Sequence, residues 1–247
     1  KIAPNAGKTE FIVFNHCTSN DQALRITLNG NYVYPSNTIR YLGVLLDSDL
    51  KWKSQIDKVA KQLKSVTGMI SKLRYYVKLP ILIQSYYALF DSLISYCCNI
   101  WGQPTSSYIE RIYTLQRKAI RIMTFSDPRC PTDPLFSRLK ILRFTDKIHV
   151  ENIIFLKKLM SDEIPPAVKA TFPIKFSHSH STRGASHNLI NLKRFATTTY
   201  GKNSIYNQSI WSWNNFLKHN KSFDITKIST NVLKLHLKNY YLSSYAK

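Results

Sequence analysis

The sequence has few acidic residues. Its 247 residues include 14 Asp and Glu against 35 Lys and Arg, which gives a formal net charge of +21. A charge of this size opposes compaction and is typical of chains that meet a polyanion, most often nucleic acid and less often a membrane surface. The excess is uneven, because residues 1–48 carry a net charge of +1 and the remainder about +20.

The chain also lacks long apolar runs and paired cysteines. No uninterrupted apolar stretch reaches the roughly 18–20 residues of a membrane span, and residues 1–14 do not have the pattern of a secretory signal. The four cysteines form no CxxC pair, which favours reduced thiols. We therefore expect an intracellular protein, nuclear or cytoplasmic. A zinc site is conceivable, but its candidate ligands have no diagnostic spacing: Cys130, His178, His180 and His187.

The first 48 residues have strand patterns. Phe11–Phe14 is a short apolar run, and 24–28 alternates apolar and polar residues before Asn29-Gly30, a strong hairpin signal. Tyr32–Tyr34 would be the returning strand. Residues 39–46 predict a further, more buried strand, in which Gly43 marks a bulge or a close approach of another backbone.

After Asp47 the apolar residues recur at helical spacing, and the sequence predicts an α+β fold. A first helix begins near Leu50, with an apolar stripe from Ile56 to Val77. A second runs from Pro80 to about Asn99, and a third covers 107–123. The packing face expected for the second is Tyr86, Leu89, Phe90, Leu93 and Ile94; that of the third is Ile109, Ile112, Leu115, Ala119, Ile122 and Met123.

Further helices are expected around 135–139, 146–160, 203–217 and 225–241, with an exposed loop at 173–188. These patterns divide the chain into a β segment (1–48), a helical domain (49–126) and a C-terminal helical region (127–247).

The cations on the predicted helices are hardly balanced by anions. Eight cations and one anion, Asp57, lie between Lys51 and Lys78. Such a helix repels itself unless phosphates or another acidic surface neutralise it. We therefore expect nucleic-acid contact from the cations of the first and third helices: Lys51, Lys53, Lys58, Lys61, Lys64, Lys72, Arg74, Arg111, Arg117, Lys118 and Arg121.

Other motifs are interpreted structurally. Gly7-Lys8-Thr9 precedes a predicted strand and lacks the earlier glycine of a phosphate loop. Asp47 or Asp49 is expected to cap the first helix. The histidines at 178 and 180 suit a polar loop. Base stacking by the four tryptophans is conceivable, but core packing is favoured for Trp52, Trp101, Trp211 and Trp213.

Several segments resemble one family in the same order. Asn5-Ala6-Gly7-Lys8-Thr9 with Phe11–Phe14 is similar to the segment just after the catalytic aspartates of non-LTR retrotransposon reverse transcriptases. The other similar segments are Tyr41-Leu42-Gly43-Val44 with Asp47, Leu50, Trp52 and Ile56; Tyr87 to Trp101-Gly102; Leu115–Arg121; Thr132–Phe136; and Thr182-Arg183.

The resemblance implies the end of a palm, a thumb and a following region of an RNA-directed DNA polymerase. It implies that Lys8 protonates the pyrophosphate leaving group, that Leu42 and Gly43 steady the primer terminus, and that the partners of the basic thumb are the RNA template and an RNA–DNA or DNA duplex. The rest of the polymerase (palm, fingers and endonuclease) would be a partner, and Mg²⁺ would belong to the complete enzyme.

The paired catalytic aspartates are not in this sequence, so we expect no activity from it alone. The alternative is a catalytically dead relic that acts as a nucleic-acid-binding or protein-interaction module. An autonomous enzyme that uses Lys8 or the histidines is disfavoured.

Overall fold

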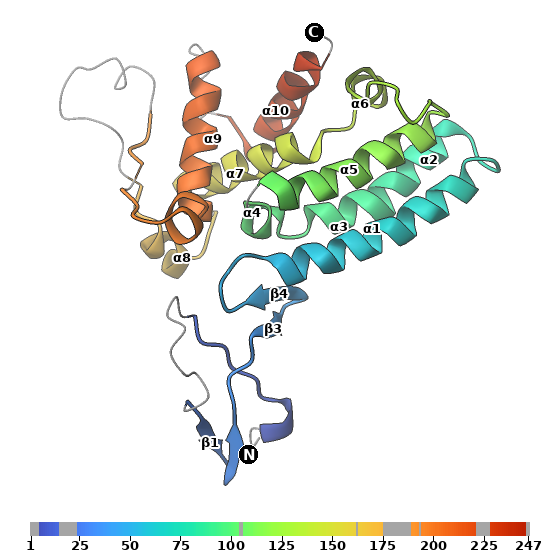
Figure 1. The fold of residues 1–247 in the computed structure, drawn as a ribbon. Helices are drawn as coiled ribbons and strands as arrows, with labels where there is room; N and C mark the ends of the chain where they lie inside the picture. The colour runs from blue at the N-terminus through green and yellow to red at the C-terminus, as the bar shows by residue number, and fades with distance from the viewer. Residues whose placement is uncertain are drawn as a thin grey trace. The chain divides into compact units, whose positions relative to one another are not determined.

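The computed structural model describes residues 5–14, 24–103, 106–161, 163–174, 189–192, 194–220 and 228–245. The chain forms two compact units, Lys1–Lys58 and Val59–Lys247. Figure 1 shows small strands near the N-terminus and helices in the rest of the chain. The α+β fold class is therefore confirmed. Thr182-Arg183, most of the 173–188 loop and the three candidate zinc-ligating histidines lie outside the described residues.

Two antiparallel hairpins form the strands of the first unit. β1 (Ile26–Leu28) pairs with β2 (Asn31–Val33), as the Asn29-Gly30 signal predicted. β3 (Thr38–Tyr41) pairs with β4 (Val44–Asp47). The expectation of one strand over 39–46 with a bulge was wrong. Leu42 and Gly43 have φ values of +46° and +85°, so they are the two turn residues of a hairpin.

The expected strand at Phe11–Phe14 is not formed either. Phe11 makes only an isolated parallel bridge to Pro35, and a short 3₁₀ turn, η1 (Ala6–Lys8), precedes it. Phe14 is exposed, and among the described residues the run is paired with another segment only through this bridge at Phe11.

The long helix α1 (Lys53–Leu73) is capped by an aspartate, as expected. The Asp47 carboxylate accepts a hydrogen bond from the Ser54 backbone N–H at 3.1 Å. The helix begins three residues later than the Leu50 predicted, because Leu50 and Trp52 have φ values of +49° and +62°. A left-handed residue cannot belong to a right-handed helix.

The second predicted helix is broken into four pieces: α2 (Leu79–Ser85), the π-helix η3 (Tyr86–Asp91), α3 (Ser92–Ser95) and α4 (Cys98–Trp101). Cys97, at φ +54°, interrupts it before α4. A π turn rotates the residues after it relative to an α-helical face. Tyr86, Phe90 and Ile94 are buried as expected, but Leu89 is exposed, so its assignment to the packing face was wrong.

The remaining helices pack around α7 (Phe144–Met160). It contacts α4, α5 (Ser106–Met123), α9 (Ile205–His219) and α10 (Thr230–Ser244). One core joins Ile153, Leu156, Trp213 and Leu237. The shorter elements are α6 (Asp133–Leu139), α8 (Pro166–Thr171) and a π turn, η5 (Thr198–Lys202). Within the described ranges, no helix is both long and apolar enough to cross a membrane.

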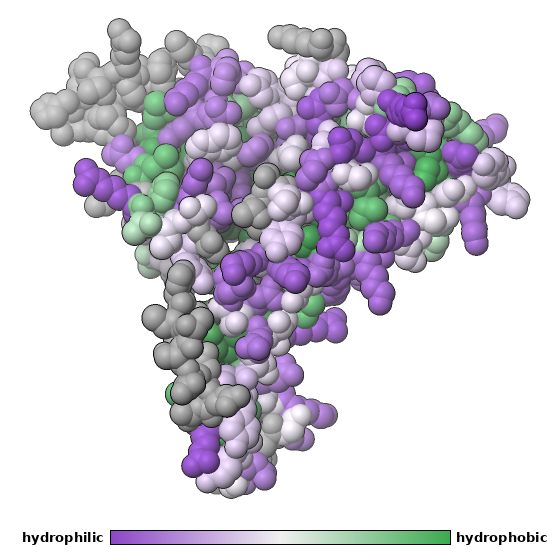
Figure 2. Space-filling model, viewed as in Figure 1, coloured by the Kyte–Doolittle hydropathy of each residue, from purple (hydrophilic) through white to green (hydrophobic). Residues whose placement is uncertain are grey.

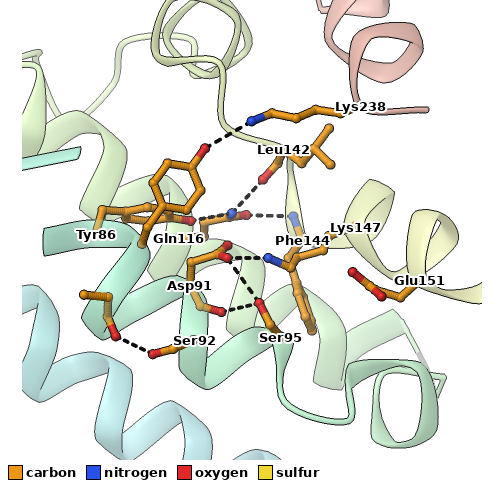
Figure 3. A network of polar contacts seen from close by, with 12 residues as sticks. Tyr86, Asp91, Ser92, Ser95, Gln116, Leu142, Phe144, Lys147, Glu151 and Lys238 are labelled. Atoms are coloured by element: carbon orange, nitrogen blue, oxygen red, sulfur yellow. Dashed lines mark hydrogen bonds and ion pairs between the residues drawn. The ribbon is translucent and has the colours of Figure 1, made fainter. Parts of the chain in front are cut away.

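A buried glutamine links three of these helical segments (Figure 3). The Gln116 amide donates to the Tyr86 hydroxyl and to the Leu142 carbonyl, both at 2.9 Å, and its oxygen accepts from the Phe144 N–H at 2.8 Å. Asp91 pairs with Lys147 beside it, and both side chains are largely buried. The periodicity of the third helix indicated Leu115 and Ile122 as inward residues, but both are only partly buried, whereas Gln116 is fully buried.

Trp101 and Gly102 are adjacent, and close packing around them requires a large side chain at the first position and no side chain at the second. Trp101 is fully buried and stacks on Phe144 with ring centroids 5.6 Å apart. A Cβ on Gly102 would lie 2.2 Å from the Cys98 carbonyl oxygen, so only glycine fits. Core packing is confirmed for Trp101 and Trp213. It was wrong for Trp211, which is exposed.

Candidate nucleic-acid interface

One side of α1 is basic in the second unit. Lys61, Lys64 and Lys72 are exposed, and at about 100° per residue they fall within an arc of about 80°. Leu63, Val66 and Ile70 occupy the opposite, buried side. Residues 59–78 contain five Lys and Arg and no Asp or Glu. Figure 2 shows hydrophilic side chains over α1 and α5. We call Lys61, Lys64 and Lys72 the α1 lysine face.

Gly68 lies in the middle of the α1 lysine face. It is exposed, and no atom lies within 4 Å of the position that a Cβ would take. Glycine costs a helix about 1 kcal/mol relative to alanine, and no neighbouring side chain requires its small size here. The missing side chain lets a large ligand come close to the helix backbone between the lysines. The sequence pattern did not single out Gly68, because a helical glycine by itself has no functional signature.

The cations of α5 differ in exposure. Arg111 and Lys118 are exposed, whereas Arg117 and Arg121 are partly buried. Arg117 pairs with Glu110, and its guanidinium lies 4.7 Å from the centre of the Tyr113 ring. Arg121 donates from Nε to the Cys130 carbonyl at 2.9 Å. Arg117 and Arg121 therefore make contacts within the folded protein. The sequence alone could not distinguish cations with this structural role from cations that bind phosphate.

Arg74, after the end of α1, is also engaged within the protein. It donates to the Ile122 carbonyl at 3.0 Å and to the Tyr75 hydroxyl at 2.7 Å. Its guanidinium also lies over the rings of Tyr75 and Phe125. It therefore joins the end of α1 to the end of α5.

Three further candidate lysines belong to the first unit. Lys51 pairs with Asp49 at 2.9 Å, and Lys53 is exposed. Lys58 donates to the Gly43 carbonyl, so it fixes the turn that contains Leu42. Of these three, Lys58 has a clear structural role.

Lys8 lies in a turn that is organised by Asn5. The Asn5 side-chain oxygen accepts a hydrogen bond from the Gly7 N–H at 2.9 Å, and the Asn5 backbone carbonyl accepts from the Lys8 N–H at 3.1 Å and the Thr9 hydroxyl at 2.8 Å. This pattern gives a local reason for the spacing of Asn5, Lys8 and Thr9. The Lys8 side chain is exposed.

Leu42 and Gly43 form the tip of the β3–β4 hairpin. The φ value of +46° is unfavourable for leucine, and the Leu42 side chain is 74% exposed. Burial therefore does not compensate for the backbone strain. Strain of this kind is concentrated at functional positions.

Two titratable groups of the second unit, His149 and Cys98, have pKa values that are shifted by burial. Burial lowers the pKa of His149 to about 4, and its ring lies 5.3 Å from that of Trp211. Burial, followed by the charge of Glu151, raises the pKa of Cys98 to about 12. Neither group is suited to proton transfer or nucleophilic attack near neutral pH. Among the described residues, no three His, Cys, Asp or Glu side chains gather closely enough to hold a metal ion.

Comparisons with known proteins agree with the resemblance seen in the sequence. The chain is 29% identical over 120 residues to a probable RNA-directed DNA polymerase from transposon X-element of Drosophila melanogaster, which covers 46% of this chain and 13% of that protein. It is 23% identical over 150 residues to the RNA-directed DNA polymerase from mobile element jockey of Drosophila funebris, covering 60% of this chain and 16% of that protein. No protein-family profile matches, and no solved structure matches.

Proposed function

We propose that this chain is part of an RNA-directed DNA polymerase and that its helical unit holds the primer–template. The α1 lysine face would contact phosphates, and Gly68 would allow the backbone to come close. Contacts of this kind fix position without reading base sequence. The observation that carries the proposal is a group of exposed lysines within residues 59–78, a stretch that contains no Asp or Glu, in a chain similar to two such polymerases.

The test is binding of the whole chain to an RNA–DNA duplex at several salt concentrations. Replacement of all three residues of the α1 lysine face by glutamine should weaken binding. It should also reduce the slope of log K against log salt by about one for each lost phosphate contact.

The matched control replaces three exposed lysines elsewhere in the same unit, Lys158, Lys202 and Lys218, by glutamine. It removes the same charge and should change the slope much less. Equal losses in the two triple variants would show that only net charge matters, and would contradict the proposal for α1.

In the complete polymerase, Lys8 would act as the acid for the leaving pyrophosphate and the Leu42–Gly43 turn would steady the primer end. The exposed side chains of Lys8 and Leu42 support these roles. Lys8→Ala should slow single-turnover nucleotide addition, and Lys8→Arg should not restore the rate fully, because arginine does not give up its proton. An unchanged rate in Lys8→Ala would remove the role.

The first unit would be completed by other parts of the polymerase. Several of its apolar and aromatic side chains are exposed, including Phe14, Ile26, Tyr34 and Tyr41. Burial of these side chains against the rest of a palm would supply the apolar contacts that the small hairpins do not make themselves.

A further inference from the structure

Three exposed aromatic rings lie where α1 and α5 end. Tyr76 is 86% exposed, Tyr75 67% and Phe125 58%. The rings of Tyr75 and Phe125 meet edge to face, with centroids 5.8 Å apart. Large apolar side chains are seldom left this open in one place without a binding role. We call Tyr75, Tyr76 and Phe125 the aromatic tip.

Arg74 holds two rings of the aromatic tip in place. Its guanidinium carbon lies 4.8 Å from the centre of the Tyr75 ring and 4.4 Å from that of Phe125. Its hydrogen bonds to the Ile122 carbonyl and the Tyr75 hydroxyl fix it further. The rings are therefore preorganised, so a ligand that binds them loses less conformational entropy.

Phe125 occupies a backbone position that favours glycine. The Ser126 N–H bonds to the Arg121 carbonyl and the Phe125 N–H to the Ile122 carbonyl, the Schellman pattern that ends α5. Phe125 is at the left-handed position of this pattern, with φ +53°. Glycine would adopt this conformation at a lower free-energy cost. Phe125 is exposed, so burial of its ring does not offset the backbone strain. The contacts of the ring with Arg74 and Tyr75 still leave Phe125 58% exposed, so much of the ring is open to a ligand.

The surroundings of the aromatic tip are cationic. Lys72, Lys78 and Arg129 are exposed close to it in the chain, and the one carboxylate nearby in sequence is Asp127. Aromatic rings among cations suit single-stranded nucleic acid, because each base presents a flat face and each linkage a negative charge. An apolar protein surface would not match this charge.

We infer that the aromatic tip stacks on unpaired bases of single-stranded RNA or DNA, apart from the duplex contacts of the α1 lysine face. This inference rests on the proposed function, since it assumes that the helical unit binds nucleic acid. It extends that function to a second ligand, single-stranded nucleic acid, which would bind at residues that the sequence pattern did not indicate.

The test compares Tyr76→Ala with Tyr76→Phe in the whole chain. The probes are a short oligouridylate, an abasic oligonucleotide of the same length and an RNA–DNA duplex. Tyr76→Ala should weaken binding of the oligouridylate by about 5- to 100-fold and leave the other two probes nearly unchanged. Tyr76→Phe should bind like the unmodified protein, because the ring is kept.

The matched control is Tyr96→Ala, which removes an exposed tyrosine from the turn between α3 and α4. It should leave binding of all three probes unchanged. Thermal unfolding of each variant checks the fold, and Tyr76 is exposed enough that its removal should not change the midpoint.

The outcomes separate the two proposals. Unchanged oligouridylate binding in Tyr76→Ala, with normal duplex binding, would overturn the aromatic tip and leave the proposed function standing. Equal losses for the oligouridylate and the abasic probe would also overturn it. Failure of the unmodified chain to bind any probe would overturn both. Tyr76→Leu separates stacking from apolar contact: full oligouridylate binding by this variant would show that the aromatic ring is not needed and would contradict the inference.

Discussion

In the helical unit, Val59–Lys247, large rings such as Trp101, Phe144 and Trp213 are fully buried, whereas in the described part of Lys1–Lys58 the large apolar side chains are exposed or only partly buried, apart from Val44 and Ile56. The hairpins of the first unit depend instead on turn residues and polar contacts. The Gln55 side chain accepts from the Leu45 N–H, and Asp47 accepts from Ser54. The difference indicates that the helical unit is stable through its own core and that the first unit needs additional packing.

The largest expected effect comes from removing a core ring of the helical unit. Phe144 is fully buried against Trp101, so Phe144→Ala should lower the free energy of unfolding by about 3–5 kcal/mol. Urea unfolding followed by circular dichroism at helical wavelengths measures it.

The matched change in the first unit is Tyr41→Ala, because Tyr41 is exposed. It should shift the same unfolding curve by less than about 0.5 kcal/mol. A shift as large as that of Phe144→Ala would remove the contrast between the units.

The next effect is a pH dependence of the helical unit. The folded-state pKa of His149 is about 4, below the ordinary 6.5, so the unfolded chain takes up the proton first. The contribution of His149 to the free energy of unfolding is therefore complete above about pH 6.5, and about 3 kcal/mol of it is lost as the pH falls to about 4.

The measurement is urea unfolding over this pH range for the unmodified chain and for His149→Gln. The variant cannot take up the proton, so its unfolding free energy should fall less as the pH decreases. Parallel curves for the two proteins would show that His149 is not the responsible group.

The smallest effect tests the two hairpin turns of the first unit against each other. Both turns have two residues with positive φ, but one uses Asn29-Gly30 and the other Leu42-Gly43. Leu42→Asn should stabilise its hairpin by about 1 kcal/mol, and Asn29→Leu should destabilise the other by a similar amount. Amide exchange at Leu46, opposite Ile39, and at Val33, opposite Ile26, reports on the two hairpins, because these residues belong to hydrogen-bonded pairs.

If Leu42 is kept for contact with the primer end, the more stable Leu42→Asn variant should also slow nucleotide addition in a complete polymerase. Faster or unchanged addition would mean that the strained leucine has no such role.

The sequence predicted features that depend on local chemistry. Asn29-Gly30 indicated the first hairpin, and the Asp47 cap and the long amphipathic α1 followed from residue type and spacing. It did not predict features that arise from tertiary contacts. The π turn at Tyr86–Asp91 and the left-handed Cys97 break a helix whose sequence period looks continuous. Leu42-Gly43 was misinterpreted because leucine is rare at a left-handed turn position.

The candidate site was predictable to a similar degree. Charge spacing indicated the lysines of α1. It could not show that Lys58, Arg74, Arg117 and Arg121 contact carbonyls, rings or a carboxylate within the protein, because these partners are distant in sequence or depend on side-chain direction. The aromatic tip was not predicted either, because a sequence pattern does not show whether a tyrosine or phenylalanine is exposed.

Binding of nucleic acid by α1 can be tested by lysine acetylation of the whole chain, with and without an RNA–DNA duplex, measured residue by residue by mass spectrometry. We expect the duplex to protect Lys61, Lys64 and Lys72 and to leave Lys158 and Lys218 as reactive as before. Equal reactivity of the α1 lysine face with and without the duplex, under conditions where the duplex is bound, would contradict binding by α1.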